Sequence, residues 1–86
     1  MSLPQTLKFA RADGMTAHFP MVWEVRELSS NKAPAPFLDE EHEEYFSDFV
    51  DADLFDWIQF MYECHGVTSD IVDDNNGRYI GTWSMI

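Results

Sequence analysis

The chain has few basic residues, and its middle has none. Only five of the 86 residues are Lys or Arg, against sixteen Asp and Glu, which gives a formal net charge of −11. No Lys or Arg occurs between Lys32 and Arg78, a stretch that carries thirteen of the acids. A body of this charge is a poor ligand for the phosphate backbone of a nucleic acid and a good one for a basic groove on a protein. Direct binding of a nucleic acid is therefore not expected.

Cysteine and long apolar runs are also scarce. Cys64 is the only cysteine, so no disulfide can form within the chain, and a reducing cytoplasm is the expected compartment. Residues 1–7 lack the basic region and apolar run of a secretory signal, and no apolar stretch approaches the length needed to span a membrane. A chain of this length is expected to form one small domain over residues 1–86.

The sequence lacks the motifs of common enzymes and metal sites. It has no Gly-rich phosphate loop, no Gly-x-Ser-x-Gly and no His-Glu-x-x-His. Cys64 and His65 are adjacent near a predicted helix end, where neighbouring side chains diverge, so they do not predict a nucleophile and its base. Cys64 is expected to be buried and inert. The acids and histidines match no zinc or calcium spacing. We therefore predict a protein that is not an enzyme and holds no cofactor or metal.

The acidic stretch is nevertheless rich in aromatic side chains. Eight of the thirteen aromatic residues of the chain lie between Lys32 and Arg78. An acidic segment without aromatics would be typical of a disordered tail, because it could not bury enough apolar surface to offset the entropy of ordering. This stretch is instead expected to fold and to hold its carboxylates at fixed spacing. The alternative is that the acids only solvate the surface and keep the protein soluble.

Alternating apolar residues predict a β-hairpin near the N-terminus. Every second residue from Met15 to Val25 is apolar, and the residues before this run alternate as well. A three-residue loop with a left-handed Gly14 would place Leu7 opposite Phe19 and keep one face apolar, whereas a two-residue turn would mix the faces. Pro20 marks an edge position, a bulge or a break in the strand.

A second hairpin is predicted at the C-terminus. Residues 67–72 and 79–86 are strand-like and flank a turn signal at Asn76-Gly77. Residues 29–36 combine turn formers with two prolines, so we interpret them as a connector between the first hairpin and the middle of the chain.

Two consecutive helices are expected between the hairpins. Asp39 is a candidate N-cap with acids in the turn that follows it, which predicts a helix over 40–50. In one unbroken helix the polar face would rotate by about a third of a turn further along. A second helix over 54–65, capped by Asp51 or Asp53 and stopped by the glycine after it, is therefore favoured over one long helix.

The predicted element order is strand-strand-helix-helix-strand-strand (ββααββ). This order is typical of an α+β fold in which an antiparallel sheet, built from the N- and C-terminal hairpins, carries both helices on one face. The second helix is apolar nearly all round, and one sheet covers only one side of a helix. Any apolar surface left uncovered would be a partner or self-association surface.

The acids of the first predicted helix form the candidate binding site. Residues three and four apart on a helix lie about 5–6 Å apart, which is of the same order as the spacing of charges along a nucleic-acid strand. A rigid carboxylate array can therefore stand in for phosphates in a channel lined by Lys and Arg. The predicted partner-binding residues are these acids and two aromatic anchors from the second helix: Glu40, Glu41, Glu44, Asp48, Asp51, Trp57 and Phe60.

In size, charge and expected rigidity, the chain resembles the small acidic nucleic-acid mimics that phages use against host restriction, CRISPR or repair machinery. This is a likeness of class without a shared motif. It implies a non-enzymatic inhibitor whose acidic face occupies a basic groove of a nucleic-acid-handling protein. One alternative is an immunity or antitoxin-type protein that neutralises a basic toxin. Another is a homodimer joined through residues 54–62, whose acids only keep it soluble.

Overall fold

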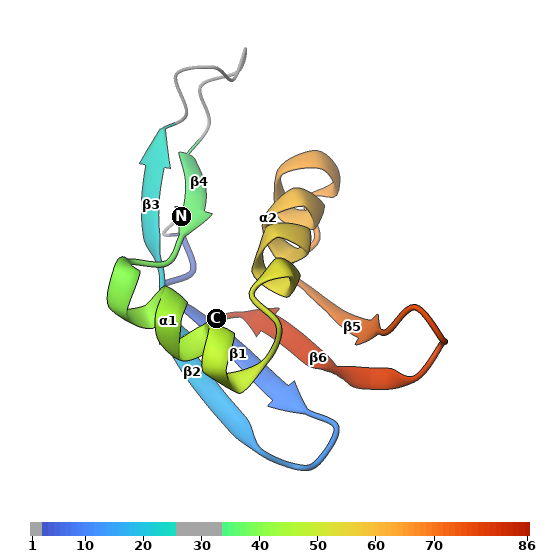
Figure 1. Cartoon of the computed structure of the whole chain (residues 1–86). Helices are drawn as coiled ribbons and strands as arrows, with labels where there is room; N and C mark the ends of the chain where they lie inside the picture. Colours follow the sequence, from blue (N-terminus) through green and yellow to red (C-terminus); the bar gives the residue numbers. More distant parts are fainter. Residues whose placement is uncertain (1–2, 26–33) are drawn as a thin grey trace.

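A computed structural model describes residues 3–25 and 34–86 of the chain, arranged as in Figure 1. The main sheet has four antiparallel strands in the order β2-β1-β6-β5, and β3 and β4 form a separate two-stranded ribbon. The elements follow one another as β1 (Thr6–Arg11), β2 (Thr16–Pro20), β3 (Val22–Val25), β4 (Pro34–Phe37), α1 (Glu40–Phe49), α2 (Asp53–His65), β5 (Ser69–Asp73) and β6 (Tyr79–Met85). The predicted α+β fold is confirmed, whereas the ribbon was not predicted.

The register of the first hairpin is the predicted one. Leu7 pairs with Phe19, and Gly14 adopts a left-handed conformation with φ at 92°. On its other side β1 pairs with β6, so that Phe9 lies opposite Trp83. These four apolar side chains are fully buried, because the chosen register turns the apolar side of each strand to the same face of the sheet.

The second hairpin is also confirmed, and its turn depends on an aspartate. The carboxylate of Asp74 accepts hydrogen bonds from the backbone N–H groups of Asn76 and Arg78, each at 2.8 Å. Gly77 supplies the left-handed residue of the turn, with φ at 77°. A side chain that bonds to its own turn in this way fixes the loop without a tertiary contact.

The strand predicted from Met15 to Val25 is broken in the middle. β2 ends at Pro20, and β3 leaves the main sheet to pair with β4. Residues 34–36, interpreted as part of a connector, are therefore strand, while residues 29–33 lie outside the described residues. The N–H groups of a strand point alternately to its two sides, so the donors that Pro34 and Pro36 lack would both lie on the same side of β4. β4 can still pair with β3 along its other side.

A buried glutamine joins this ribbon to α2. Gln59 is the polar side chain that is buried among the described residues, and its Nε2 donates to the carbonyl oxygen of Pro36 at 2.6 Å. Trp23 of β3 makes a second link, with its ring 5.2 Å from that of Tyr62. The ribbon is thereby fixed against α2.

The two predicted helices are confirmed, and one long helix is excluded. Asp39 caps α1 by accepting a hydrogen bond from the His42 N–H at 2.8 Å. The N-cap position of α2 is Ala52, which makes no side-chain cap hydrogen bond. Of the two aspartates predicted to cap this helix, Asp51 is the one whose carboxylate accepts from an N–H of its first turn, that of Asp53, at 3.0 Å. Gly66, left-handed with φ at 66°, ends α2.

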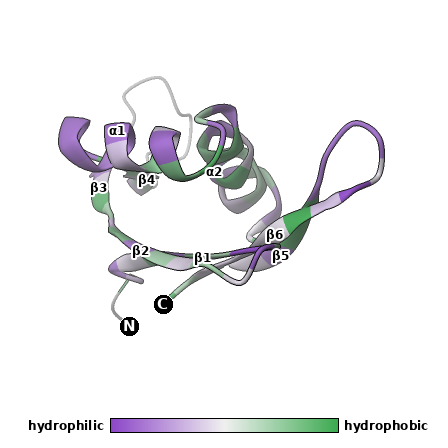
Figure 2. Cartoon of the chain, turned by 60° about the horizontal axis from the view of Figure 1, so that its bottom comes forward, coloured by the Kyte–Doolittle hydropathy of each residue, from purple (hydrophilic) through white to green (hydrophobic). Residues whose placement is uncertain are grey.

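Both helices lie on the same side of the main sheet, as Figure 2 shows. Phe46 anchors α1: its ring lies 5.0 Å from Phe19 on β2 and 5.8 Å from Phe55 on α2. Ile58 of α2 is fully buried in the same core. None of the described elements covers the opposite face of the sheet.

Candidate functional site

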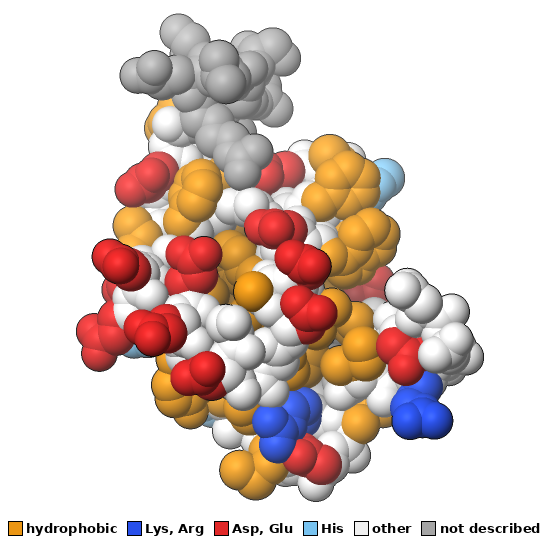
Figure 3. Space-filling view, viewed as in Figure 1, with side chains coloured by type: hydrophobic (Ala, Val, Ile, Leu, Met, Phe, Trp, Pro, Cys, Tyr) orange, Lys and Arg blue, Asp and Glu red, His pale blue; other side chains and the backbone are white. Residues whose placement is uncertain are grey.

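All five acids of α1 are exposed, and the helix contains no Lys or Arg. Phe46 and Phe49 occupy the side of α1 that faces the core, so the acids are left on the sides that face solvent. Figure 3 shows acidic side chains gathered over α1. We call this set the acidic face: Glu40, Glu41, Glu43, Glu44 and Asp48.

The nearest described cation is used elsewhere. Arg11 binds Asp13, donates from Nη1 to the carbonyl oxygen of Phe49 at 2.8 Å, and lies 4.5 Å from the centroid of the Phe49 ring. The hydrogen bond from Arg11 lowers the pKa of Asp13. Arg11 thus ties the C-terminal end of α1 to the first hairpin and neutralises Asp13, not the acidic face.

Most of the acids lie on one side of the main sheet. Ten of the sixteen acids lie between Asp39 and Glu63, in the helical layer. On β1, β2 and β6, the residues that alternate away from the core carry no acid: Thr6, Lys8, Ala10, Thr16, His18, Pro20, Thr82 and Ser84. The negative charge of the molecule is therefore concentrated on its helical side.

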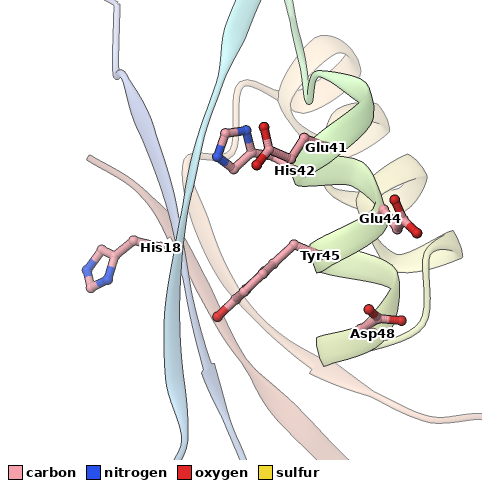
Figure 4. A pocket seen from close by; sticks show the side chains of 6 residues that line it. All are labelled: His18, Glu41, His42, Glu44, Tyr45 and Asp48. Carbon is pink, nitrogen blue, oxygen red and sulfur yellow. The ribbon is translucent and has the colours of Figure 1, made fainter.

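An open groove of about 450 Å³ runs between α1 and β2. Figure 4 shows Tyr45 pointing from α1 toward β2, where its ring packs edge-on against Phe19 at 5.2 Å, whereas His18 projects away from α1. The side chains do not converge on a common point, so the groove assembles no nucleophile with its base. Its lining residues are His18, Glu41, His42, Glu44, Tyr45 and Asp48.

Metal-ligating side chains do not gather either. Within residues 3–25 and 34–86, no group of three or more His, Cys, Asp or Glu side chains could hold a metal ion. His42 instead binds Asp39 through Nδ1 at 2.7 Å. The hydrogen bonds from the backbone N–H and the ring of His42 hold the pKa of Asp39 below its ordinary value.

Two aromatic side chains of α2 face solvent. Trp57 is 48% exposed and Phe60 is 46% exposed, and their rings stack with centroids 5.6 Å apart and planes inclined by 26°. The ring of His65 lies edge-on to Phe60 at 5.7 Å. We call Trp57 and Phe60 the aromatic pair. In Figure 3 hydrophobic side chains gather over α2, separated from α1 by further acids.

The expectation that Cys64 is buried is wrong. Its side chain is exposed, because Cys64 lies four residues after Phe60 and shares the solvent-facing side of α2 with the aromatic pair. The apolar residues around this helix left open which side would be uncovered, and the structure covers the side that carries Phe55 and Ile58.

The predicted partner-binding residues fall into separate groups. Four of them lie on the acidic face, and Asp51 is exposed with its carboxylate bound to the Asp53 N–H at the start of α2. The aromatic pair lies on the other helix. Tyr45 was not among the predicted partner-binding residues, and it is 54% exposed in the groove. The apolar spacing of α1 could not reveal this, because an aromatic residue at the margin of a helix face fits either environment.

Comparison of the chain with models of protein families, with curated proteins and with solved structures finds no match. Among the described helices, none combines the length and the apolarity that crossing a bilayer requires.

Proposed function

We propose that the protein is a non-enzymatic inhibitor or adaptor that binds a nucleic-acid-handling protein. In this proposal the acidic face lies in a groove lined by Lys and Arg and takes the place of nucleic-acid phosphates. The observation that supports it most is the concentration of exposed carboxylates, without Lys or Arg among them, on the helical side of the sheet.

Repulsion within the acidic face destabilises the isolated protein. Glu40, Glu44 and Asp48 follow one another at four-residue spacing on α1, and like charges so placed destabilise a helix by about 0.2–0.5 kcal/mol per pair before screening by salt. A basic partner would relieve this repulsion. The array is also held rigidly, since Asp39 caps α1 and Phe46 fixes it to the core. Rigid charges lose little entropy on binding, which favours affinity and fast association.

A purely solubilising role fits the distribution of charge less well. Solubility requires net charge, but it does not require that the charge be on one side of the molecule. The open face of the main sheet carries Lys8, His18 and small or polar residues, yet none of its β1, β2 and β6 positions is acidic.

The proposal is tested by reversing charge at two sites in parallel. The variant Glu44→Lys/Asp48→Lys changes the acidic face, and the control Asp70→Lys/Asp73→Lys makes the same change of net charge on β5, where both aspartates are exposed. Each immobilised protein is used to capture proteins from lysate of its native host, and duplex DNA or RNA is used to displace them. Circular dichroism and thermal melting check that both variants are folded. We expect them to be, because surface substitutions rarely change the free energy of unfolding by more than about 0.5 kcal/mol.

We expect wild type and the β5 control to retain a protein that nucleic acid displaces, and the acidic-face variant to lose it. Equal loss of the captured protein by both variants would mean that only net charge matters for binding. Retention of the captured protein by the acidic-face variant would mean that the partner binds another part of the surface. Either result contradicts the proposal, and capture of a basic toxin instead would favour the immunity-type alternative.

A further inference from the structure

We infer that the aromatic pair, together with Asp53 and Asp56, is an arginine-selective contact site for the basic partner. This inference rests on the proposed function and specifies which cations of the partner this part of the surface recognises. The occupant is an arginine-bearing segment of that protein.

The site combines two half-exposed aromatic side chains with nearby carboxylates. Asp53 precedes Trp57 by four residues, and Asp56 precedes Phe60 by four, and all four side chains are exposed. Side chains of an α-helix lean toward its N-terminus, so each ring covers the turn that carries its aspartate. Residues at this spacing have Cβ atoms about 5–6 Å apart. Each aromatic ring therefore has one carboxylate within reach of the same bound cation.

Neither aspartate is neutralised within the part of the chain that the structure describes. The described ion pairs join Arg11 to Asp13 and His42 to Asp39, and α2 contains no Lys or Arg. Among the described residues, Asp53 and Asp56 therefore have no cationic partner that would compete with a cation from another protein.

Arginine matches this arrangement better than lysine. A guanidinium is planar, stacks on the face of an aromatic ring, and can at the same time donate two parallel hydrogen bonds to a carboxylate. A lysine ammonium is a strongly hydrated point charge that makes no such stacked and forked contact. An aromatic ring on one turn of a helix and a carboxylate on the turn before it therefore favour binding of a guanidinium group over an ammonium group.

The charge around the pair opposes the other occupants. A second copy of this chain would bring another body of net charge −11 against the first, with the aspartates of both copies close together. An apolar partner would bury Asp53 and Asp56 without compensating charge. A basic segment is the occupant that covers the rings and the carboxylates together.

The test uses two synthetic peptides of equal length and charge that differ only in having Arg or Lys at every basic position. Binding is followed by calorimetry at low salt. We expect wild type to bind the Arg peptide about tenfold more tightly, the scale of a cation–π contact that is partly desolvated. The double variant Trp57→Ala/Phe60→Ala should bind both peptides equally, with the affinity for the Lys peptide unchanged.

The acidic-face variant Glu44→Lys/Asp48→Lys separates this inference from the proposed function. This variant should lower the affinity for both peptides by the same factor and preserve the preference for the Arg peptide. Failure of wild type to bind either peptide would contradict the proposed function as well. Equal binding of both peptides by wild type, or a preference that survives in the double variant, would overturn the arginine site alone.

Cys64 gives a readout that needs no substitution in the aromatic pair. Because its exposed thiol lies one turn after Phe60, the Arg peptide should slow its modification by a thiol reagent more than the Lys peptide does at equal occupancy. Equal protection would overturn the inference. The inference would also be overturned if sedimentation showed a concentration-dependent dimer and if Trp57→Ala dispersed this dimer. That result would mean that the aromatic pair binds a second copy of the chain.

Discussion

Asp39 combines two roles at the scale of a single residue. Its carboxylate caps α1 through the His42 N–H and also binds the His42 ring. Both hydrogen bonds favour the ionised carboxylate, the backbone bond most strongly, so the pKa of Asp39 is lower in the folded protein than in an ordinary aspartate. The start of the acidic face thus depends on an ionised side chain.

This linkage predicts an acid-sensitive contribution to stability. Because the folded pKa of Asp39 lies below its unfolded value, the stabilisation is complete above the unfolded pKa and is lost as pH falls through the folded pKa. The variant Asp39→Asn keeps an acceptor for the cap but cannot be protonated. Its melting temperature should therefore fall less than that of wild type between neutral and strongly acidic pH. Identical acid profiles for the two proteins would contradict this prediction.

Gln59 is predicted to be the most sensitive polar residue of the core. Gln59→Leu would leave the carbonyl oxygen of Pro36 buried without its donor, which costs about 1–3 kcal/mol in free energy of unfolding. Met61→Leu, at a half-buried position of the same helix, is the matched control and should cost less than about 1.5 kcal/mol. Urea unfolding measures both, and a Gln59→Leu variant as stable as the control would show that the bond contributes little.

At the scale of elements, the sequence predicted most of the fold because the apolar patterns left one solution. The register of Leu7 against Phe19 followed from keeping the apolar faces together. The break between the helices followed from the rotation of the polar face. The pairing of β4 could not be predicted, because Pro34 and Pro36 remove donors and resemble a connector until Val22–Val25 is known to lie beside them.

The candidate site was predictable only as far as exposure follows from helix geometry. The acids of α1 are where the helical period placed them. Which side of α2 is covered could not be deduced, because its apolar residues surround the helix and the covering elements come from distant parts of the chain. Trp57 and Phe60 were expected to be anchors for a partner, whereas the exposure of Cys64 emerged only from the tertiary arrangement.

The break between the helices depends on Asp51. Asp51→Ala removes the acceptor for the Asp53 N–H and should lower the free energy of unfolding by about 0.5–2 kcal/mol, the usual cost of losing an N-cap. Asp48→Ala removes the same charge from an exposed position and is the control. We expect it to be neutral or slightly stabilising in urea unfolding. Equal effects of the two substitutions would mean that charge, not capping, decides stability here.

At the scale of the whole molecule, the net charge of −11 acts against the compact state. Added salt screens repulsion between exposed carboxylates, with a Debye length of about 8 Å at physiological ionic strength. The melting temperature should therefore rise as salt is raised from low to physiological concentration. The rise should be smaller in Glu44→Lys/Asp48→Lys, which converts part of the repulsion into attraction. A melting temperature that does not change with salt would contradict the picture of a strained acidic face.

In our proposal the acidic face and a nucleic acid compete for the same groove of a partner. The most direct measurement titrates this protein into a preformed complex of the captured partner with labelled duplex DNA or RNA and follows anisotropy together with complex mass. We expect one molecule of this protein to replace each nucleic acid that is released, and release to weaken as salt rises because both ligands bind through charge. A stable ternary complex, in which the partner holds the nucleic acid and this protein at once, would contradict it.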